Sequence, residues 1–264
     1  MAQTISREVD HSVHPVRRRA PQLPWPLNLY QTAIGKKYAM ALTGIGLLGF
    51  VVVHMIGNLH LYEGPTEVHE YAEALRELGG RLVPRTGVLW ALRLGLIAMF
   101  AVHIHAAYSL SRMSHKADKS YVGKRDFVAA NFASRTMRWT GPIVLLYVLF
   151  HLADLTWGWL SDDWYAGDPY NNVYVSMSAL PIAIIYIAAN IALAVHIFHG
   201  AWSMFQTLGI NNPRYNGMRK GFARGIAGLI LIGNLSFPLA VQGGLIDIDN
   251  HTPGSYAIDA EENG

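Results

Sequence analysis

The sequence predicts an all-α integral membrane protein in which five transmembrane helices form a bundle, and two observations lead to this prediction. Hydrophobic residues make up 52% of the 264 residues and charged residues only 15%, which lies outside the usual balance of a soluble globular domain. In addition, five stretches meet or approach the length of about 20 apolar residues that a helix needs to cross a hydrocarbon core. These stretches are residues 37–61, 87–111, 139–160, 177–206 and 223–243.

The spans divide the chain into three parts. Residues 1–35 form a polar, proline-containing N-terminal arm, and this arm lacks the short apolar core and small-residue cleavage site of a signal peptide. Residues 36–243 form the five-helix domain, and residues 244–264 form an acidic tail. We find no convincing internal repeat and no GxGxxG, P-loop or nucleophile-elbow motif.

The segments between the predicted membrane surfaces differ in character. Gly44, Gly46 and Gly49 in the first span allow a neighbouring helix or a flat cofactor to approach the backbone closely. The sequence "EGPTEVHEYAEALRELGG" after this span predicts a short amphipathic surface helix. The third span ends in an aromatic belt, the fourth is long enough to tilt or project, and the fifth has no histidine and is expected to close the bundle.

Basic residues lie mainly on one side of the spans, which predicts the orientation of the chain. By the positive-inside rule, the N-terminus is inside and the C-terminus outside. The basic residues therefore indicate a polarised membrane protein and no nucleic-acid partner. The residues on the basic side include Arg17, Arg18, Arg19, Lys36, Lys37, Arg112, Lys116, Lys124, Arg125, Arg135, Arg138, Arg214, Arg219, Lys220 and Arg224.

Four histidines, one in each of the first four spans, are the main functional signal. A histidine in hydrocarbon is costly unless it has a partner. His54 lies 17 residues from Lys37 and His151 lies 13 residues from Arg138, so both are roughly 20–25 Å from the inner surface. His103 and His196 lie nine and ten residues from the inner ends of their spans, or about 13–15 Å.

These depths predict two His–His pairs, an outer pair of His54 with His151 and an inner pair of His103 with His196. Bis-imidazole ligation of two b haems requires such pairs, because low-spin iron takes one axial nitrogen on each face. The chain has no cysteine, which excludes disulfides and iron–sulfur ligation by this chain alone. A tetrahedral zinc site is disfavoured, because His54 and His103 lie at different depths.

Other polar residues near these pairs have more than one reading. His199, three residues after His196, could hydrogen-bond a propionate of the inner haem. His60 is interpreted as a snorkelling or quinone-contacting group, and His105 as a packing or propionate-side histidine. Asp154 either orients the His151 imidazole, serves in proton uptake or makes a structural hydrogen bond. The remaining histidines are expected to be ordinary surface residues: His11, His14, His69, His115 and His251.

Several sequence motifs resemble one known family. They are "HMIGNL" at His54, "HxxxAxxL" from His103 to Leu110, "SRTMRWTG" before the third span, "HLADLTWG" at His151 and "HIFHGAWSMFQTLGINNP" from His196. With these motifs, residues 36–243 resemble the cytochrome b membrane anchor of succinate:quinone oxidoreductase, of the five-helix, two-haem, actinobacterial-like type. In that family pattern the ligand in "HIFHG" is His196, and the haem pairs are the same two that the depths predict.

The resemblance implies a multi-pass protein of the bacterial cytoplasmic membrane without a complete active site of its own. Its partners would be the flavoprotein and iron–sulfur subunits of succinate dehydrogenase, and a further small membrane subunit is compatible with it. Electrons would pass to menaquinone or another quinone. Four residues near the basic side are candidates for the quinone site: Tyr30, Lys37, Arg138 and Trp139. An outer quinone pocket, with Glu63 or Glu67 handling protons, is a further alternative.

Two other functions fit the same features. One is the dihaem anchor of another quinone-linked enzyme, such as fumarate reductase, formate dehydrogenase or hydrogenase. The other belongs to a different class, a proton-linked transporter whose buried histidines relay protons, for which inverted repeats and broken helices would be expected.

Overall fold

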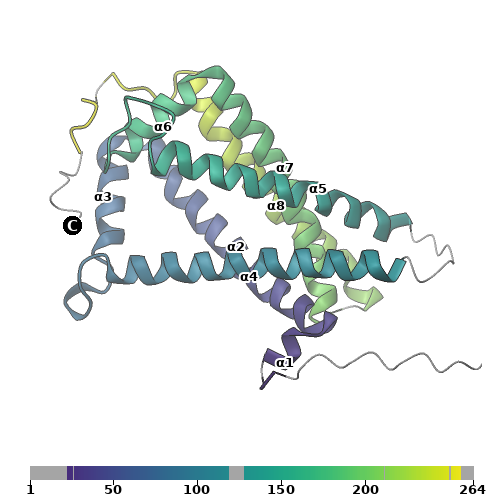
Figure 1. Ribbon diagram of the computed structural model, residues 1–264. Helices are drawn as coiled ribbons and strands as arrows, with labels where there is room; N and C mark the ends of the chain where they lie inside the picture. The colour runs from purple at the N-terminus through teal and green to yellow at the C-terminus, as the bar shows by residue number, and fades with distance from the viewer. Residues whose placement is uncertain (1–22, 26, 119–127, 211, 250, 257–264) are drawn as a thin grey trace, which may run out of the picture.

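The computed structural model describes residues 23–25, 27–118, 128–210, 212–249 and 251–256, without the side chains of residues 115–118 and 128–135. Over these ranges the chain is helical and contains no β-strand (Figure 1). The all-α fold class is thereby confirmed. The helices are α1 (Leu27–Tyr30), α2 (Ala33–Asn58), α3 (Pro65–Arg76), α4 (Gly87–Asp118), α5 (Val128–His151), α6 (Pro169–Ser178), α7 (Leu180–Thr207) and α8 (Asn216–Gln242).

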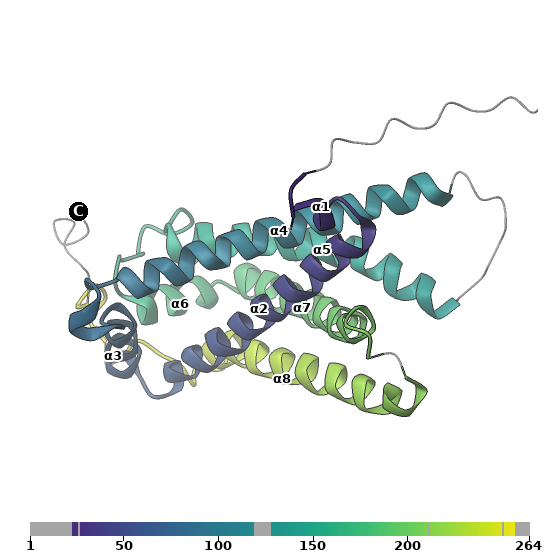
Figure 2. The same cartoon turned by 90° about the horizontal axis from the view of Figure 1, so that it is seen from below.

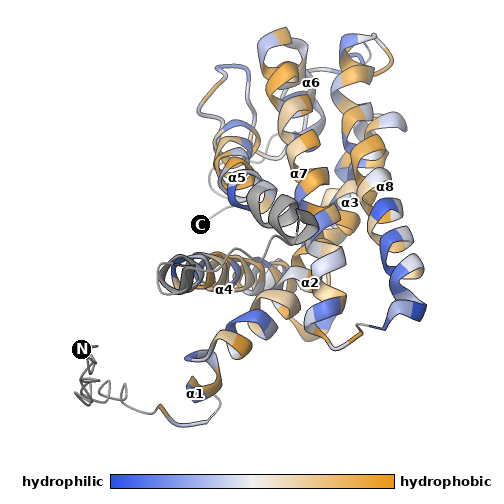
Figure 3. Cartoon of the chain, turned by 90° about the vertical axis from the view of Figure 1, so that its right-hand side faces the viewer, coloured by the Kyte–Doolittle hydropathy of each residue, from blue (hydrophilic) through white to orange (hydrophobic). Residues whose placement is uncertain are grey.

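Five helical segments are long and apolar enough to cross a membrane, as the sequence predicts. They are Ala33–Tyr62, Gly87–Ser114, Thr136–Thr156, Leu180–Thr207 and Pro213–Gln242. Apolar residues cover most of their length, and hydrophilic residues gather at the free end of α8 (Figure 3). The chain is therefore a multi-pass membrane protein.

Several span boundaries differ from the prediction, and at two of them a side chain caps the helical turn. Helix α2 begins at Ala33, inside the segment expected to be an arm, since the Thr32 hydroxyl accepts a hydrogen bond from the backbone N–H of Gly35 at 2.9 Å. The fifth span begins ten residues earlier than expected, at Pro213. There the Asn212 side chain accepts from the N–H of Arg214 at 2.9 Å and starts the turn that leads into α8.

The long helices pack as two antiparallel pairs, with α8 alongside. Helix α4 lies against α2, helix α5 lies against α7, and α8 packs mainly on α7 (Figures 1 and 2). Helix α7 also touches α2 and so joins the two pairs. In the described residues, α2 has no extensive contact with α5, nor α4 with α7. The backbones of α2 and α5 therefore stay apart, as do those of α4 and α7, and each of these two helix pairs is bridged by histidine side chains.

The two ends of the bundle carry different charges. We call the end with α1 and the N-terminus of α8 the basic end, because the described residues there include Lys36, Lys37, Arg219 and Lys220. The opposite end, with α3 and α6, is the acidic end. The predicted amphipathic surface helix corresponds to α3, where Glu73 forms ion pairs with Arg76 and with Arg85, the latter at 2.6 Å. The orientation of these ends in a membrane stays a prediction, and the basic residues before 23 and in 119–127 lie outside the described part.

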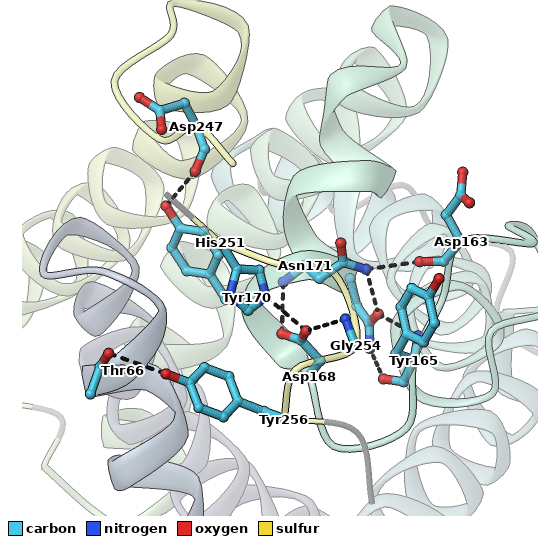
Figure 4. A network of polar contacts seen from close by, with 11 residues as sticks. Thr66, Asp163, Tyr165, Asp168, Tyr170, Asn171, Asp247, His251, Gly254 and Tyr256 are labelled. Atoms are coloured by element: carbon cyan, nitrogen blue, oxygen red, sulfur yellow. Dashed lines mark hydrogen bonds and ion pairs between the residues drawn. The ribbon is translucent and has the colours of Figure 1, made fainter. Parts of the chain in front are cut away.

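The chain after α8 folds back over the acidic end instead of hanging free as a tail. We call residues 245–249 and 251–256 the C-terminal strap. Asp168 is fully buried, and its Oδ2 accepts from His251 Nε2 at 2.8 Å and from the Gly254 N–H at 3.0 Å (Figure 4). The strap is held further by a hydrogen bond from Tyr170 to the carbonyl of Asp247, at 2.8 Å.

This strap corrects the expectation that His251 and His69 are ordinary surface residues. The His251 side chain is only 4% exposed, because its ring is enclosed between the strap and α6. The His69 ring stacks on Tyr256 at 4.2 Å between centroids, and its Nδ1 is buried. Sequence position alone places both outside the spans, but the folded tail encloses the His251 side chain and covers part of the His69 ring. His11, His14 and the side chain of His115 lie outside the described residues.

Candidate functional site

The structure brings His54 of α2 and His151 of α5 together in the half of the bundle nearer the acidic end. Their ring centroids are 5.9 Å apart and their planes are nearly perpendicular, at 88°. We call these two residues the acidic-end pair. Aromatic packing fixes both rings: Phe50, one turn before His54, stacks on it at 5.3 Å and 13°, and Tyr147 and Tyr186 pack on His151.

A second pair forms nearer the basic end. The rings of His103 of α4 and His196 of α7 have centroids 6.4 Å apart and planes at 63°. We call these residues the basic-end pair. The structure thus joins the same partners that helix rise predicts, first span with third and second with fourth.

Both basic-end rings lie beside a Thr-Gly dipeptide of another helix. Thr43 Oγ1 is 3.2 Å from His103 Nδ1, and Thr140 Oγ1 is 3.4 Å from His196 Nδ1. A side chain in place of the adjacent glycine would touch the ring, since a Cβ at Gly44 would lie 3.4 Å from His103 and one at Gly141 would lie 3.9 Å from His196. Glycine therefore allows each helix to approach the imidazole closely.

The two Thr-Gly dipeptides reveal a short internal correspondence that sequence reasoning missed. Nine residues separate Gly44 from His54 in α2, and nine separate Gly141 from His151 in α5. Ten helical steps of about 1.5 Å place the two pairs about 15 Å apart along the helix axes. The pattern Thr-Gly-x9-His is present in the printed sequence, but the sequence does not show that its Thr-Gly part contacts a histidine. Only the structure shows that the His103 ring of α4 and the His196 ring of α7 lie beside it.

The ring separations suit a metal held between two imidazoles. A metal–imidazole bond of about 2.0 Å on each side, with ring radii of roughly 1.1 Å added, gives about 6 Å between centroids. The observed separations of 5.9 and 6.4 Å are of this size. In the described part of the chain no group of three or more histidine or carboxylate side chains could hold a metal ion. Each pair offers two imidazoles, the number that axial ligation of one haem would require.

The exposure of the rings also fits a flat group between helices. His54 remains exposed, and His103, His151 and His196 are half-buried, although all four lie well inside the spans. The helices that carry each pair have no extensive contact with each other in the described residues. A macrocycle lying between the helices of each pair would place its iron between the rings.

Other histidines singled out from the sequence have partners of their own. His105 Nδ1 is 2.6 Å from the Tyr30 hydroxyl, and the two rings stack at 5.6 Å. His60 Nδ1 is 2.8 Å from Glu63 Oε2, and its ring stacks on Tyr71. His199 is buried one turn from His196 toward the basic end, next to the Phe198 ring. The propionate contact of His199 stays a prediction.

Asp154 does not orient His151. Its Oδ2 accepts hydrogen bonds from the hydroxyls of Ser176 in α6 and Tyr186 in α7, the latter at 2.7 Å. His151 Nδ1 is buried and has no hydrogen-bond partner in the described residues. Asp154 lies in a π-helical turn, Leu152–Thr156, and its two bonds fasten this turn to the neighbouring helices. The structural hydrogen bond is therefore the reading that the structure favours.

The four quinone candidates differ in their surroundings. Tyr30 has a distinct environment, with the His105 hydrogen bond and the Lys36 ammonium 5.9 Å from its ring centroid. Lys37 is exposed, and Trp139 is 75% exposed. Arg138 is exposed beside Trp139. The structure does not assign a quinone to any of them.

Comparison with known protein families, curated proteins and solved structures gives no match to this chain.

Proposed function

We propose that this chain is the dihaem cytochrome b anchor of a succinate:quinone oxidoreductase of the bacterial cytoplasmic membrane. The observation that carries the proposal is the meeting of two histidine pairs, one at each depth, from four different spans. In this role His54 and His151 hold one b haem and His103 and His196 hold the other. Each bound haem would supply a one-electron carrier between two axial nitrogens.

The surrounding residues are suited to holding the ligands in place. Phe50, Tyr147 and Tyr186 restrict the acidic-end rings by aromatic contacts. Gly44 and Gly141 let α2 and α5 approach the basic-end rings. The two pairs lie about 15 Å apart along the helices, so the two haems would form a path for electrons across much of the span.

The basic end is the proposed docking surface for the iron–sulfur subunit, which would itself bind the flavoprotein subunit. The described side chains that can contribute to this surface are Lys36 and Lys37 of α2 and Lys220 of α8, whereas Arg219 is fully buried. The quinone, menaquinone or another, is proposed to bind near the same surface. Tyr30 is the best supported contact, because His105 and Lys36 hold its ring.

The first test is a reduced-minus-oxidised spectrum of the purified complex, with haem counted as pyridine haemochrome. We expect two b haems per chain in the wild type and one in His54→Ala and in His196→Ala, each variant losing a different haem. His60→Ala is the matched control and should retain both, because His60 pairs with Glu63 instead of another imidazole. A wild-type complex without b haem would overturn the proposal and favour a transporter or a haem-free anchor.

The partner subunits test the enzyme assignment separately. Copurification with a flavoprotein and an iron–sulfur protein, with succinate-dependent quinone reduction, is the expected result. Copurification with a formate dehydrogenase or a hydrogenase would leave the haem sites intact but overturn the succinate assignment.

A further inference from the structure

The two threonines next to the basic-end pair also bond to the backbone of their own helices. Thr43 Oγ1 lies 2.7 Å from the carbonyl oxygen of Ala39 and 3.3 Å from that of Met40, both in the preceding turn of α2. Thr140 Oγ1 lies 2.9 Å from the carbonyl oxygen of Thr136, one turn earlier in α5. A carbonyl oxygen can only accept, so each threonine donates its single hydroxyl proton to its own helix.

Because the hydroxyl proton is used in this way, the hydrogen bonds indicate which ring nitrogen of His103 and of His196 carries a proton. Because each threonine oxygen has no further proton to give, it can only accept from the nearby ring nitrogen, at 3.2 Å for His103 and 3.4 Å for His196. The Nδ1 of each ring therefore carries the proton; the hydrogen-bond network, and not an observed hydrogen, makes this assignment. The lone pair is left on Nε2, the nitrogen on the ring edge turned away from the threonine.

The acidic-end pair is held differently. His151 Nδ1 is buried without a hydrogen-bond partner in the described residues, and His54 is fixed by stacking on Phe50. Thr43 is followed eleven residues later by His54 and Thr140 by His151, so each helix supplies a ligand at one depth and an anchoring hydroxyl at the other.

We propose that Thr43 and Thr140 are positioning residues, which fix the Nδ1–H tautomer of His103 and His196 and present both Nε2 atoms to one iron. This inference rests on the proposed function. A hydrogen bond donated by an axial imidazole makes the other nitrogen more basic and so stabilises the oxidised metal. The threonines therefore lower the reduction potential of the haem at the basic end and leave the other haem unaffected.

The test is a redox titration of the intact complex, with electron paramagnetic resonance of the oxidised haems, for Thr43→Val, Thr140→Val and the double variant. Valine keeps the shape of the side chain and removes the hydroxyl. One net hydrogen bond of about 1 kcal/mol corresponds to a roughly threefold to tenfold change in the ratio of reduced to oxidised haem at a fixed potential. We expect a shift of this size toward the reduced form at the basic-end haem, with a changed resonance, and none at the other haem.

Two controls separate this role from a general loss of stability. Thr43→Ser and Thr140→Ser retain the hydroxyl and should restore the wild-type potential and resonance. Thr207→Val removes a hydroxyl that bonds its own helix in the same way, to Ser203 O at 3.3 Å, but at the end of α7. This control should shift neither haem.

The outcomes also distinguish the inference from the proposed function. Two haems with unchanged potentials and resonances in both valine variants would overturn the threonine assignment alone. Loss of the basic-end haem in the valine variants, with retention in the serine variants, would support it. A wild-type complex without haem would overturn the proposed function, and this inference with it.

Discussion

Asp168 is predicted to be the residue that fastens the C-terminal strap to the acidic end. Its carboxylate accepts three hydrogen bonds, from the N–H of Asn171 at 3.2 Å, from His251 at 2.8 Å and from the N–H of Gly254 at 3.0 Å. The first bond caps α6, and the other two hold the strap (Figure 4). Asp168→Ala removes both acceptor oxygens, and with them all three hydrogen bonds, at a position with no exposed surface.

The expected magnitude follows from these three bonds. Loss of a helix N-cap costs about 1 kcal/mol. A buried donor without a partner costs about 1–3 kcal/mol, so leaving the strap in place with two such donors would cost about 2–6 kcal/mol. The strap can instead swing out and hydrate both donors. We therefore expect its opening free energy to fall by about 3 kcal/mol, which is a roughly hundredfold rise in the open population.

Hydrogen exchange of the intact complex, followed by mass spectrometry of peptides covering 245–256, measures this opening. Asp247→Ala is the matched control, because among the described residues the Asp247 side chain bonds only the exposed N–H of Asp249, and its link to Tyr170 uses the backbone carbonyl. Exchange of the strap should be much faster in Asp168→Ala than in Asp247→Ala. Equal exchange in the two variants would refute the assignment of Asp168 as the anchor.

Two other substitutions test the acidic end. Gly57→Ala should lower the melting temperature relative to Gly49→Ala, because a Cβ at Gly57 would lie 2.7–2.9 Å from Tyr71, whereas one at Gly49 meets open space. Overpacking of this kind costs about 1–3 kcal/mol of stability. Equal melting temperatures of the two variants would contradict the predicted clash with Tyr71. Partial burial raises the pKa of Glu73, but hydrogen bonds from its two arginine partners lower the pKa by more, so it lies below the ordinary value. A depressed folded pKa means that ionised Glu73 stabilises the fold above about pH 4.5 and loses this effect as the pH falls through the folded pKa. Glu73→Gln should thus reduce thermal stability near neutral pH more than in acid, and an equal reduction at both would count against the ion pairs.

The sequence alone predicted the five spans and the two histidine pairs, and both predictions have the same physical basis. A helix rises by a fixed distance for each residue, about 1.5 Å, so depth in the bundle can be counted along the chain. His54 and His151 could therefore be matched by depth, as could His103 and His196, without knowing where any helix lies. Apolar length likewise depends only on composition, because the hydrocarbon thickness is constant.

Tertiary structure decided every feature that depends on how helices face one another. The contact of Thr43 with His103 and that of Thr140 with His196 each join different helices, and no local pattern states which side chain on one helix meets which on another. The same reason explains why Asp154 bonds Ser176 and Tyr186 instead of the histidine three residues before it.

The burial of His251 shows the same limit at the acidic end. Its position after the last span predicts exposure, but the chain returns across α6 and buries the ring against Asp168. Depth is a property of one helix and can be read from the sequence. Rotation of helices about their axes and the path of a connecting segment are set by the summed packing of many residues, so only the folded chain determines them.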